Sequence, residues 1–366
     1  MNKTKLLLWA IERTSRSAEH RARRLRKLSN LIASETEDQI ASNRKIPQRP
    51  GLSTVSVSAD LPGTDDRHRT AVVMQGPVIS RDDLTFKTLQ LYRQSMPHAV
   101  LILSTWNDLP VENRKRIEQL GVRVVESVLP NHRGPQNVNL QIASTSRGIQ
   151  EAHAMECRYV LKTRTDTWIN QCDADQFCRN LIDRFPLTVP HGAGDNRQTA
   201  RIVTLDFATR LYIPYHPSDI MMFGRTEDLL RYWTPDLFGP EWQYTYDDNF
   251  GHLAGQPLPE TMMCEKFLRS QGVEPKGTIA DWWNTLAERF IVVDRPMIDH
   301  RWLKEFTNSE EPPERVRDRS NMAVCHFTQW MQMHCGRAEP MAGLATLASQ
   351  SLYAPLLGEN DKPHAA

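Results

Sequence analysis

The sequence predicts an α/β protein built on a mainly parallel sheet that is flanked by helices. Two observations lead to this prediction: short, continuously apolar runs recur from residue 70 onward, and the segments between them have helical periodicity. Strands that are apolar throughout are typical of parallel sheets, in which helices cover both faces. A third observation is that polar side chains follow several of these runs, at the place where α/β proteins bind ligands.

The first half of this pattern is regular. Four apolar runs are predicted to be strands: Ala71–Met74, Val100–Leu103, Val122–Val125 and Tyr159–Thr163. Three segments between them are predicted to be helices: Asp82–Gln94, Glu112–Leu120 and Val138–Met155. Acidic residues at the start of the first helix and Gly121 after the second are usual at helix ends. Beyond residue 190 the pattern is looser, with strands expected within 202–213 and 219–223 and helices over 226–233 and 261–270.

The chain divides by composition into a central domain and three other segments. Residues 1–50 form a basic leader with an apolar start, residues 51–69 a linker, and residues 336–366 a tail. The domain over residues 70–335 is expected to have two halves, 70–190 and 191–335, and is long enough to bury a substantial core. A basic helix with an apolar end can bind an anionic membrane, each cation adding about 1 kcal/mol. A solvated or partly disordered leader is the alternative.

Composition excludes several classes of protein. A net charge of +1 gives no nucleic-acid signature. The six cysteines are scattered without a CxxC pair, so reduced thiols in the cytoplasm are the default. No apolar run approaches the ~20 residues that span a bilayer. Glu12 and Arg13 interrupt the apolar start of the chain, which argues against a signal peptide.

The usual nucleotide loops are missing, since the chain has neither GxxxxGK[ST] nor a GxGxxG after a strand. Polar residues at predicted strand ends and at one helix start are the candidate nucleotide-binding groups instead. They are Gln75, Gly76, Pro77, Thr105, Trp106, Asp108, Asn139, Gln141, Arg164, Thr165 and Asp166. Each has a plain structural alternative: a turn at Gly76, a packing role for Trp106, and a cap of the next turn for Asp166.

Three more polar residues are candidates for chemistry. Asp219 precedes an apolar run, where a buried unpaired carboxylate is costly, so it must find a donor or face a cleft. Glu260 begins a predicted helix, where it can act as a cap or as a general base. His326 follows a strand-like run and is either a metal ligand or a structural histidine. Asp247 and Asp248 form a competing acidic pair.

Together these segments resemble the WavE lipopolysaccharide-synthesis family over roughly residues 70–330. The resemblance rests on Val72–Pro77, Leu103–Asp108, Asn139–Gln141, Tyr159–Asp166, Ser218–Gly224 and Pro259-Glu260. It implies a GT-A-like glycosyltransferase fold, with residues 70–190 as the nucleotide-sugar half and residues 191–335 as the acceptor half. It also implies that Arg164-Thr165-Asp166 stands where GT-A enzymes carry an Asp-X-Asp metal motif. Arg164 replaces the first acid, so a Mn²⁺ or Mg²⁺ cofactor would depend on Asp166, with His326 as a second ligand.

The function implied is transfer of a sugar from a nucleotide sugar to a glycan or glycolipid acceptor, in lipopolysaccharide core or capsule synthesis. Glu260 is expected to deprotonate the acceptor, and Asp219 to position hydroxyl groups. The tryptophans of the second half are expected to line an acceptor groove. The alternative is a catalytically silent GT-A-like module that binds nucleotide or glycan. Nucleotide sugars are cytosolic, so we expect a cytoplasmic protein, held at the inner leaflet if the leader binds membrane.

Overall fold

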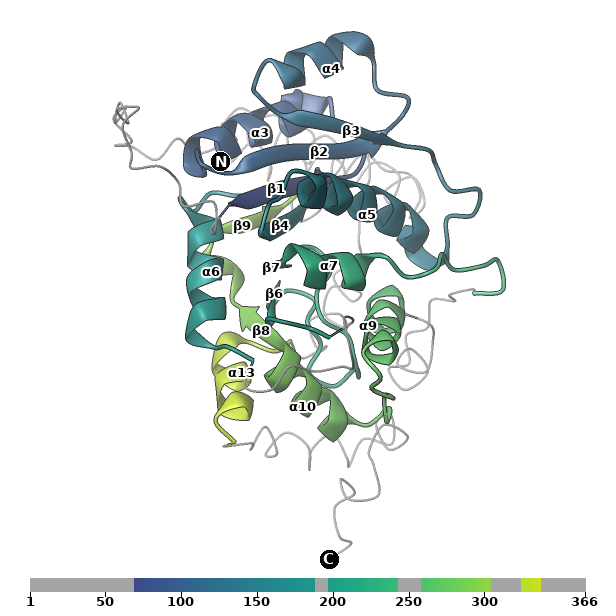
Figure 1. Ribbon diagram of the computed structural model, residues 1–366, viewed down its shortest axis with the longest axis vertical. Helices are drawn as coiled ribbons and strands as arrows, with labels where there is room; N and C mark the ends of the chain where they lie inside the picture. The colour runs from purple at the N-terminus through teal and green to yellow at the C-terminus, as the bar shows by residue number, and fades with distance from the viewer. Residues whose placement is uncertain (1–68, 188–196, 243–257, 304–323, 337–366) are drawn as a thin grey trace, which may run out of the picture. The chain divides into compact units, whose positions relative to one another are not determined.

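The computed structural model describes residues 69–187, 197–242, 258–303 and 324–336 (Figure 1). Contacts divide the chain into two units, Met1–Gly63 and Thr64–Ala366, and all described residues belong to the second. The basic leader, all of the linker except Arg69, the acidic pair Asp247-Asp248 and the tail beyond Gly336 lie outside the described residues. Within the described ranges, no helix combines the length and the apolar character needed to cross a bilayer.

A seven-stranded sheet with the order β3-β2-β1-β4-β7-β6-β8 forms the centre of the domain. Its strands are β1 (Thr70–Gln75), β2 (Val100–Trp106), β3 (Arg123–Ser127), β4 (Tyr159–Arg164), β6 (Ile202–Leu205), β7 (Met222–Arg225) and β8 (Phe290–Val293). Neighbours in β3-β2-β1-β4 are parallel, as are β6 and β8. Only β7 runs against its neighbours β4 and β6. The predicted α/β class and mainly parallel sheet are therefore confirmed.

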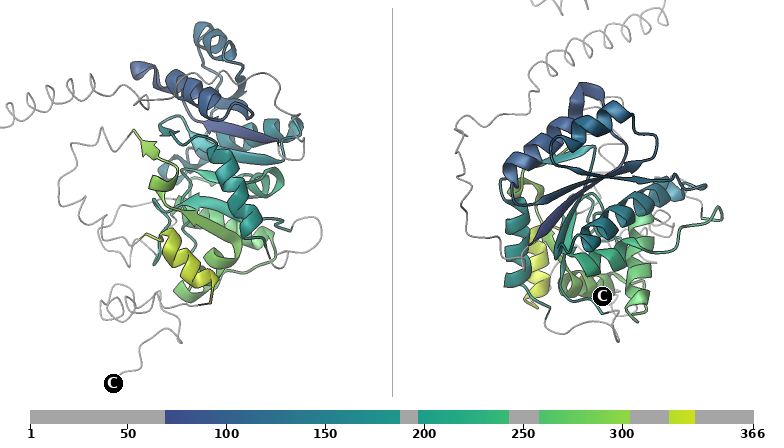
Figure 2. Two further views of the ribbon diagram at one scale, coloured as in Figure 1. Left: turned by 90° about the vertical axis from the view of Figure 1, so that its left-hand side faces the viewer. Right: turned by 45° about the horizontal axis from the view of Figure 1, so that its top comes forward.

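Helices cover both faces of the sheet, as continuously apolar strands require. The described helices are α3 (Leu84–Ser95), α4 (Val111–Glu118), α5 (Val138–Ala154), α6 (Ala174–Arg184), α7 (Thr226–Trp233), α9 (Pro259–Ser270), α10 (Ile279–Arg289) and α13 (Phe327–His334). The chain winds outward from β1 to β3 through α3 and α4, then returns to β4 through α5. Because crossovers are right-handed, this reversal puts α5 on the opposite face from α3 and α4, as Figure 2 shows.

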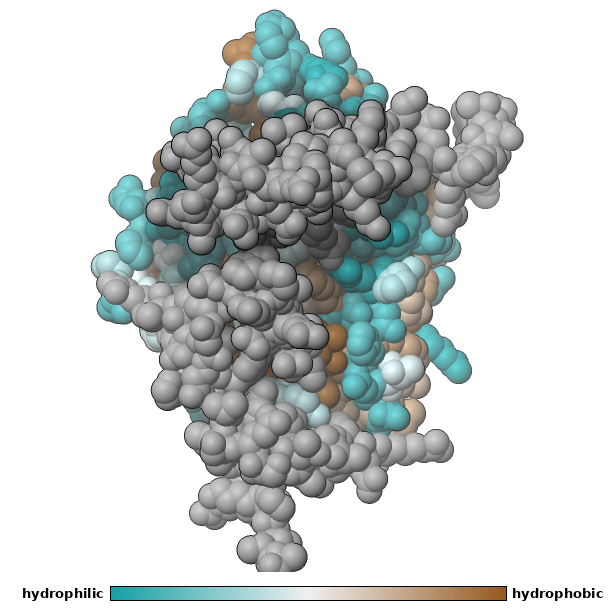
Figure 3. Space-filling view, turned by 180° about the vertical axis from the view of Figure 1, so that it is seen from behind, coloured by the Kyte–Doolittle hydropathy of each residue, from teal (hydrophilic) through white to brown (hydrophobic). Residues whose placement is uncertain are grey.

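Smaller elements complete the domain. A two-stranded antiparallel ribbon pairs β5 (Thr167–Ile169) with β9 (His300–Trp302), and so brings the residues after β4 beside a segment far along the chain. Single 3-10 turns lie at Arg81–Asp83, Pro135–Asn137 and Arg295–Met297. On the side opposite to Figure 1, the described residues at the α4 end are mainly hydrophilic (Figure 3), in keeping with the polar sequence of α4.

Most tryptophans of the second half belong to the core, contrary to the expectation that they line an acceptor groove. Trp233, Trp282, Trp283 and Trp330 are buried. Three of them donate their indole N–H to backbone carbonyl groups: Trp282 to Arg210, Trp283 to Leu211 and Trp330 to Phe290. Each of these three indoles therefore fills a core position and has its polar atom satisfied there, whereas Trp233 Nε1 has no hydrogen-bond partner among the described residues. Trp242, 41% exposed, keeps a surface position, while Tyr244 and Tyr246 lie outside the described residues.

Several predicted boundaries also shift. The run from Asp219 yields a strand only from Met222, because the backbone bends at Ile220 and Met221 before it pairs with β4 and β6. The helix expected from Asp82 begins at Leu84, since Asp82 and Asp83 have positive φ angles that an α-helix does not accept. The strand-like run before His326 contributes one isolated bridge in the described residues, between Val324 and Arg210.

Candidate functional site

The carboxyl ends of β1, β2, β4, β6 and β8 meet at one edge of the sheet, because these five strands share a direction. Backbone hydrogen bonds tie the first three ends together: the Gly76 amide donates to the Ser104 carbonyl, and the Thr165 amide donates to the Gln75 carbonyl, both at 3.0 Å. Ligands of open α/β sheets bind at this edge. The structure therefore gathers the predicted strand-end residues at the expected place.

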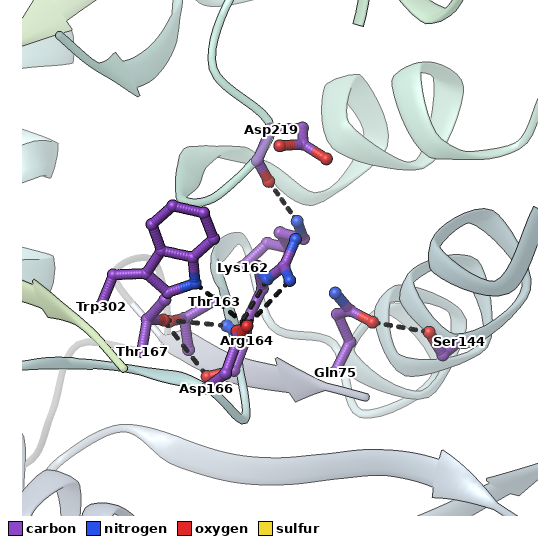
Figure 4. A network of polar contacts seen from close by, with 9 residues as sticks. All are labelled: Gln75, Ser144, Lys162, Thr163, Arg164, Asp166, Thr167, Asp219 and Trp302. Carbon is purple, nitrogen blue, oxygen red and sulfur yellow. Dashed lines mark hydrogen bonds and ion pairs between the residues drawn. The ribbon is translucent and has the colours of Figure 1, made fainter. Parts of the chain in front are cut away.

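Arg164, the last residue of β4, and Asp166 form a bidentate ion pair at the end of this strand (Figure 4). Arg164 Nε lies 2.8 Å from Asp166 Oδ1, and its Nη2 lies 2.9 Å from Oδ2. The Trp302 indole donates a further hydrogen bond to Asp166 Oδ2 at 3.0 Å. Burial opposes the charge on Arg164, but hydrogen bonding to Asp166 and the nearby carboxylates outweigh it and raise the arginine pKa. Both carboxylate oxygens of Asp166 are thus engaged by donors.

Lys162 lies behind this pair, inside the sheet. Its side chain is 0% exposed, its Nζ donates to the backbone carbonyl of Asp219, and the amine lies 4.3 Å from the centre of the Trp233 ring. Burial lowers the lysine pKa to about 7, against the opposing effect of the Asp219 carboxylate. A buried amine with a pKa near neutrality can be charged or neutral, and the nearby carboxylates favour its charged form. Figure 4 shows Lys162 pointing from β4 toward Asp219.

Asp219, Glu260 and His216 form the acidic side of the site. Asp219 is 9% exposed and precedes β7, and Glu260 lies in the first turn of α9 with its side chain 18% exposed. His216 Nε2 lies 3.5 Å from Glu260 Oε2. Burial, reinforced by the charge of Asp219, raises the Glu260 pKa to about 7. A carboxyl group with a pKa near neutrality is suited to accept a proton during catalysis.

A second acidic group lies at the ends of β6 and β8. Asp206 and Asp294 directly follow these two paired strands, and His326 caps the start of α13. His326 Nδ1 is 3.1 Å from Asp206 Oδ2 and 3.5 Å from Asp294 Oδ1. One ligand atom from each residue falls within 4.8 Å of the others, so this group can hold a metal ion. Asp166 does not belong to it, although the sequence analysis pairs Asp166 with His326.

Trp302 connects the Arg164–Asp166 ion pair with the segment that carries Asp206. Its indole binds Asp166, and its ring lies 5.4 Å, centroid to centroid, from the ring of Phe207, the residue after Asp206. The Asp206 carboxylate accepts backbone hydrogen bonds from Phe207 and Arg295 through Oδ1, which leaves Oδ2 facing His326. These hydrogen bonds fix the orientation of the Asp206 carboxylate in the group that it forms with Asp294 and His326.

Two other candidate nucleotide-binding residues, Asn139 at the start of α5 and Gln75 at the end of β1, have structural partners. Asn139 is buried: its amide donates to the carbonyls of His132 and Phe238, and its oxygen accepts from the Phe238 amide. Gln75 accepts from the Ser144 hydroxyl at 2.8 Å. The buried Gln141 Oε1, by contrast, has no hydrogen-bond partner among the described residues.

The remaining predicted residues divide between core and surface. Thr105 and Trp106 are buried, which favours packing over base stacking, whereas Asp108 and Pro77 are exposed. Thr165 is buried against Gly76: a Cβ on this glycine would lie 2.7 Å from the Thr165 hydroxyl oxygen. Gly76 therefore lets β1 and β4 end in close contact.

Four residues of the site were not assigned in the sequence analysis: Lys162, His216, Asp206 and Asp294. Asp206 and Asp294 carry the same signal as Asp166, an aspartate directly after an apolar strand. The signal was missed because the apolar periodicity around residues 202–213 and 290–294 is too weak to predict where these strands end. Lys162 interrupts an otherwise apolar strand, which is itself a signal because buried lysines are rare without a partner.

Fold and site define an α/β protein with paired acids and buried cations at the carboxyl edge of its sheet. A profile of the WavE lipopolysaccharide synthesis family matches residues 70–335. Since this is well over half of the chain, the protein belongs to the WavE lipopolysaccharide synthesis family, as the sequence resemblance indicated. A search among curated proteins found no match.

Two solved structures are distantly similar to part of the chain. One is a cytidylyltransferase from Leptospira borgpetersenii serovar Hardjo-bovis (strain JB197), with 13% identity and a TM-score of 0.28. The other is a glycosyltransferase involved in the glycosylation of the major capsid of PBCV-1, with 13% identity and a TM-score of 0.27. The matches cover 44% and 45% of this chain, which spans 62% and 65% of those chains. Likenesses this distant carry no information about activity.

Proposed function

We propose that this protein transfers a sugar from a nucleotide-sugar donor to a growing cell-surface glycan, either lipopolysaccharide core or capsular polysaccharide. The observation that carries the proposal is the meeting of Arg164, Lys162, Asp219 and Glu260 at one sheet edge, where Lys162 donates to the Asp219 carbonyl and the charges of the four residues act on one another. A buried lysine and a partly buried arginine beside a carboxyl group of raised pKa provide both electrostatic stabilisation and a proton acceptor. Family membership supports a role in lipopolysaccharide synthesis.

Glu260 is the proposed general base. In an inverting transfer the acceptor hydroxyl attacks the anomeric carbon, loses its proton to a carboxylate, and the sugar–phosphate C–O bond breaks. A pKa of about 7 allows Glu260 to be ionised before the reaction and protonated after it. Asp219, on the neighbouring segment, is proposed to position sugar hydroxyl groups.

Arg164 is proposed to stabilise the departing diphosphate. Its guanidinium is held by Asp166 in a fixed orientation, and arginine binds phosphate oxygens through paired N–H groups. Negative charge that develops on the leaving group then meets a cation already in place, which costs little reorganisation. Asp166 in this arrangement orients Arg164.

A divalent cation fits the Asp206, Asp294 and His326 group better than it fits Asp166. The first set offers two carboxylates and one imidazole within 4.8 Å of one another, whereas both oxygens of Asp166 already accept hydrogen bonds from Arg164 or Trp302. Mg²⁺ prefers oxygen ligands and this set includes an imidazole nitrogen, so the set fits Mn²⁺ better than Mg²⁺. A bound cation would supply further positive charge for the diphosphate.

The acceptor is proposed to be a glycan or a glycolipid, and the protein is proposed to work in the cytoplasm, where nucleotide sugars are made. Contact of residues 1–50 with the inner leaflet would bring it near a lipid-linked acceptor. Flotation with anionic liposomes tests this contact: the full chain should float with the vesicles, and a chain that lacks residues 1–50 should not. Equal flotation of both chains would exclude the leader as the anchor.

A mass-spectrometric screen of nucleotide sugars for hydrolysis or transfer tests the enzymatic function. The intact protein should release nucleotide from one donor, and Glu260→Ala and Arg164→Ala should lose this activity while they remain folded by circular dichroism. Full activity of Glu260→Ala would remove Glu260 as the base. Retention of full activity by Arg164→Ala would remove the proposed stabilisation of the diphosphate.

A second candidate function is a catalytically silent module that binds nucleotide or glycan. It is favoured by the engagement of both Asp166 oxygens by Arg164 and Trp302, since an Asp-X-Asp site needs free carboxylate oxygens. Calorimetry with nucleoside diphosphates, with and without Mn²⁺, separates the two candidates when combined with the donor screen. Binding without turnover of any donor would support the silent module.

A further inference from the structure

Glu260 and His216 face each other within the site, although they come from different segments. His216 is buried in the connection between β6 and β7, and Glu260 lies in the first turn of α9. The Thr261 hydroxyl donates to the Pro214 carbonyl at 3.1 Å and so ties these two segments together beside the pair. Their closest side-chain atoms are His216 Nε2 and Glu260 Oε2, at 3.5 Å.

The hydrogen bond on the far side of the imidazole determines the tautomer. His216 Nδ1 lies 3.0 Å from the backbone carbonyl of Ala208. A carbonyl oxygen only accepts, so the proton must be on Nδ1. Burial, with a contribution from the positive charge of Arg210, lowers the His216 pKa to about 4. The ring is therefore neutral near pH 7, and Nε2 directs a lone pair toward Glu260.

This geometry favours one protonation state of Glu260. A lone pair facing a carboxylate oxygen is repulsive, whereas a protonated carboxyl group can donate its O–H to Nε2. Asp219 disfavours the ionised form of Glu260 as well, while Arg210 and Arg164 and a backbone N–H favour it. Lys162 also faces the cluster. Among these groups, His216 is the one with a lone pair directed at a defined oxygen of Glu260.

We infer that His216 is a positioning residue for Glu260: its Nε2 holds the oxygen that takes up the acceptor's proton and makes the carboxylate a stronger base. The inference rests on the proposed glycosyl transfer. As the acceptor oxygen bonds to the anomeric carbon, its proton moves to Glu260 Oε2. The new O–H then donates to His216 Nε2, and the electron pair of the broken C–O bond leaves with the diphosphate.

His216→Asn tests the role in the reaction. An asparagine can donate an N–H to the carboxylate, which favours the ionised form and weakens the base. The acid limb of the kcat/KM profile should move at least one pH unit lower, and the plateau rate should fall about tenfold, as a weaker general base predicts. His153→Asn, an exposed histidine on α5, is the matched control and should leave the profile unchanged. An unmoved acid limb in folded His216→Asn would overturn the inference.

A measurement without turnover separates this inference from the proposed function. In ¹⁵N-histidine-labelled protein near pH 7, the resonances lost in His216→Asn should report protonated Nδ1 and unprotonated Nε2. A protonated Nε2 would overturn the inference whether or not the protein turns over a donor. The expected tautomer, together with no turnover of any nucleotide sugar, would support the pairing and contradict only the proposed transfer. If His216→Asn does not fold, Glu260→Gln identifies the same resonances by their shift.

Discussion

Burial raises the pKa of Glu260, the proposed general base, toward neutrality. The side chain is largely buried next to Asp219, whose charge disfavours ionisation of Glu260, and it faces His216 at 3.5 Å. A helix N-terminus alone would have the opposite effect, because it stabilises a negative charge. The capping contribution that the sequence offered as the alternative is also present, because a backbone N–H at Glu260 bonds the carboxylate and lowers its pKa, but burial and Asp219 outweigh it. The cost of keeping an ionisable group in such surroundings should be measurable as a pH-dependent stability.

The stability contributed by Glu260 should be lost as pH rises. Its folded-state pKa of about 7 lies above the ordinary value of 4.5, so the folded protein binds the proton more tightly between these values. The contribution is fully present below pH 4.5 and is lost by about pH 7, with a size on the order of 3 kcal/mol. Urea unfolding of Glu260→Gln should lack this change. Parallel pH curves for the variant and the wild type would contradict the assigned environment.

Lys162 should show the opposite dependence. Burial depresses its pKa to about 7 from 10.5, so the stability that it contributes is present above pH 10.5 and is lost as pH falls toward 7. Relative to Lys162→Met, the wild type should gain at most roughly 5 kcal/mol in free energy of unfolding from pH 7 to pH 10.5. Lys115→Met, on the exposed surface of α4, is the control and should follow the wild type. Identical behaviour of the two variants would argue against a buried, charge-shifted lysine.

At the scale of elements, the close ends of β1 and β4 depend on Gly76. Its φ of +121° and the approach of Thr165 leave no room for a side chain. Gly76→Ala should cost about 1–3 kcal/mol, from backbone strain and the clash together. Gly272→Ala, at a φ of +72° with no atom within 4 Å of the added Cβ, isolates the strain and should cost less. Equal thermal shifts for the two variants would show that the strand ends do not need this contact.

The ends of β6 and β8 should determine metal affinity. Asp206→Asn should weaken Mn²⁺ binding at least tenfold, because it removes one of two carboxylate ligands from the group with Asp294 and His326. Asp166→Asn should leave the affinity unchanged, since Arg164 and Trp302 occupy that carboxylate. Mn²⁺ electron paramagnetic resonance gives both values. A greater loss of Mn²⁺ affinity in Asp166→Asn than in Asp206→Asn would contradict this assignment and support a metal site at Asp166, as the sequence resemblance implies.

The first half of the fold was predictable because its signals are local. Continuous apolar runs and helical spacing predict β1 to β4 and α3 to α5 to within a few residues, and α7 is found over its predicted range, Thr226–Trp233. Other elements were missed, including α6 and α10. The aromatic residues of α10 gave no clear periodicity: Trp282 and Trp283 are adjacent and both buried.

The site was only partly predictable, for a physical reason. Strand-end residues could be located at one sheet edge from topology alone, but their partners come from segments that lie far apart in the sequence. Asp166 meets Trp302, and His326 meets Asp206, across more than 100 positions. Hydrogen bonds over such separations leave no periodic trace in a single sequence.

At the scale of the whole molecule, the sheet combines two groups of parallel strands around the antiparallel β7. The cationic pair of Lys162 and Arg164 belongs to β4, and the acidic groups lie at the ends and connections of β6, β7 and β8. In the proposed transfer, the first group would face the diphosphate of the donor and the second would supply the base. The division into halves at residue 190 stays a prediction.

A crystal structure with Mn²⁺ and the nucleoside diphosphate that calorimetry selects tests the central claim most directly. We predict that the diphosphate lies at the carboxyl edge of the sheet, with its oxygens within hydrogen-bonding distance of Arg164 and the cation on Asp206 and Asp294. A diphosphate bound away from this edge, with Arg164 still paired only to Asp166, would contradict the account.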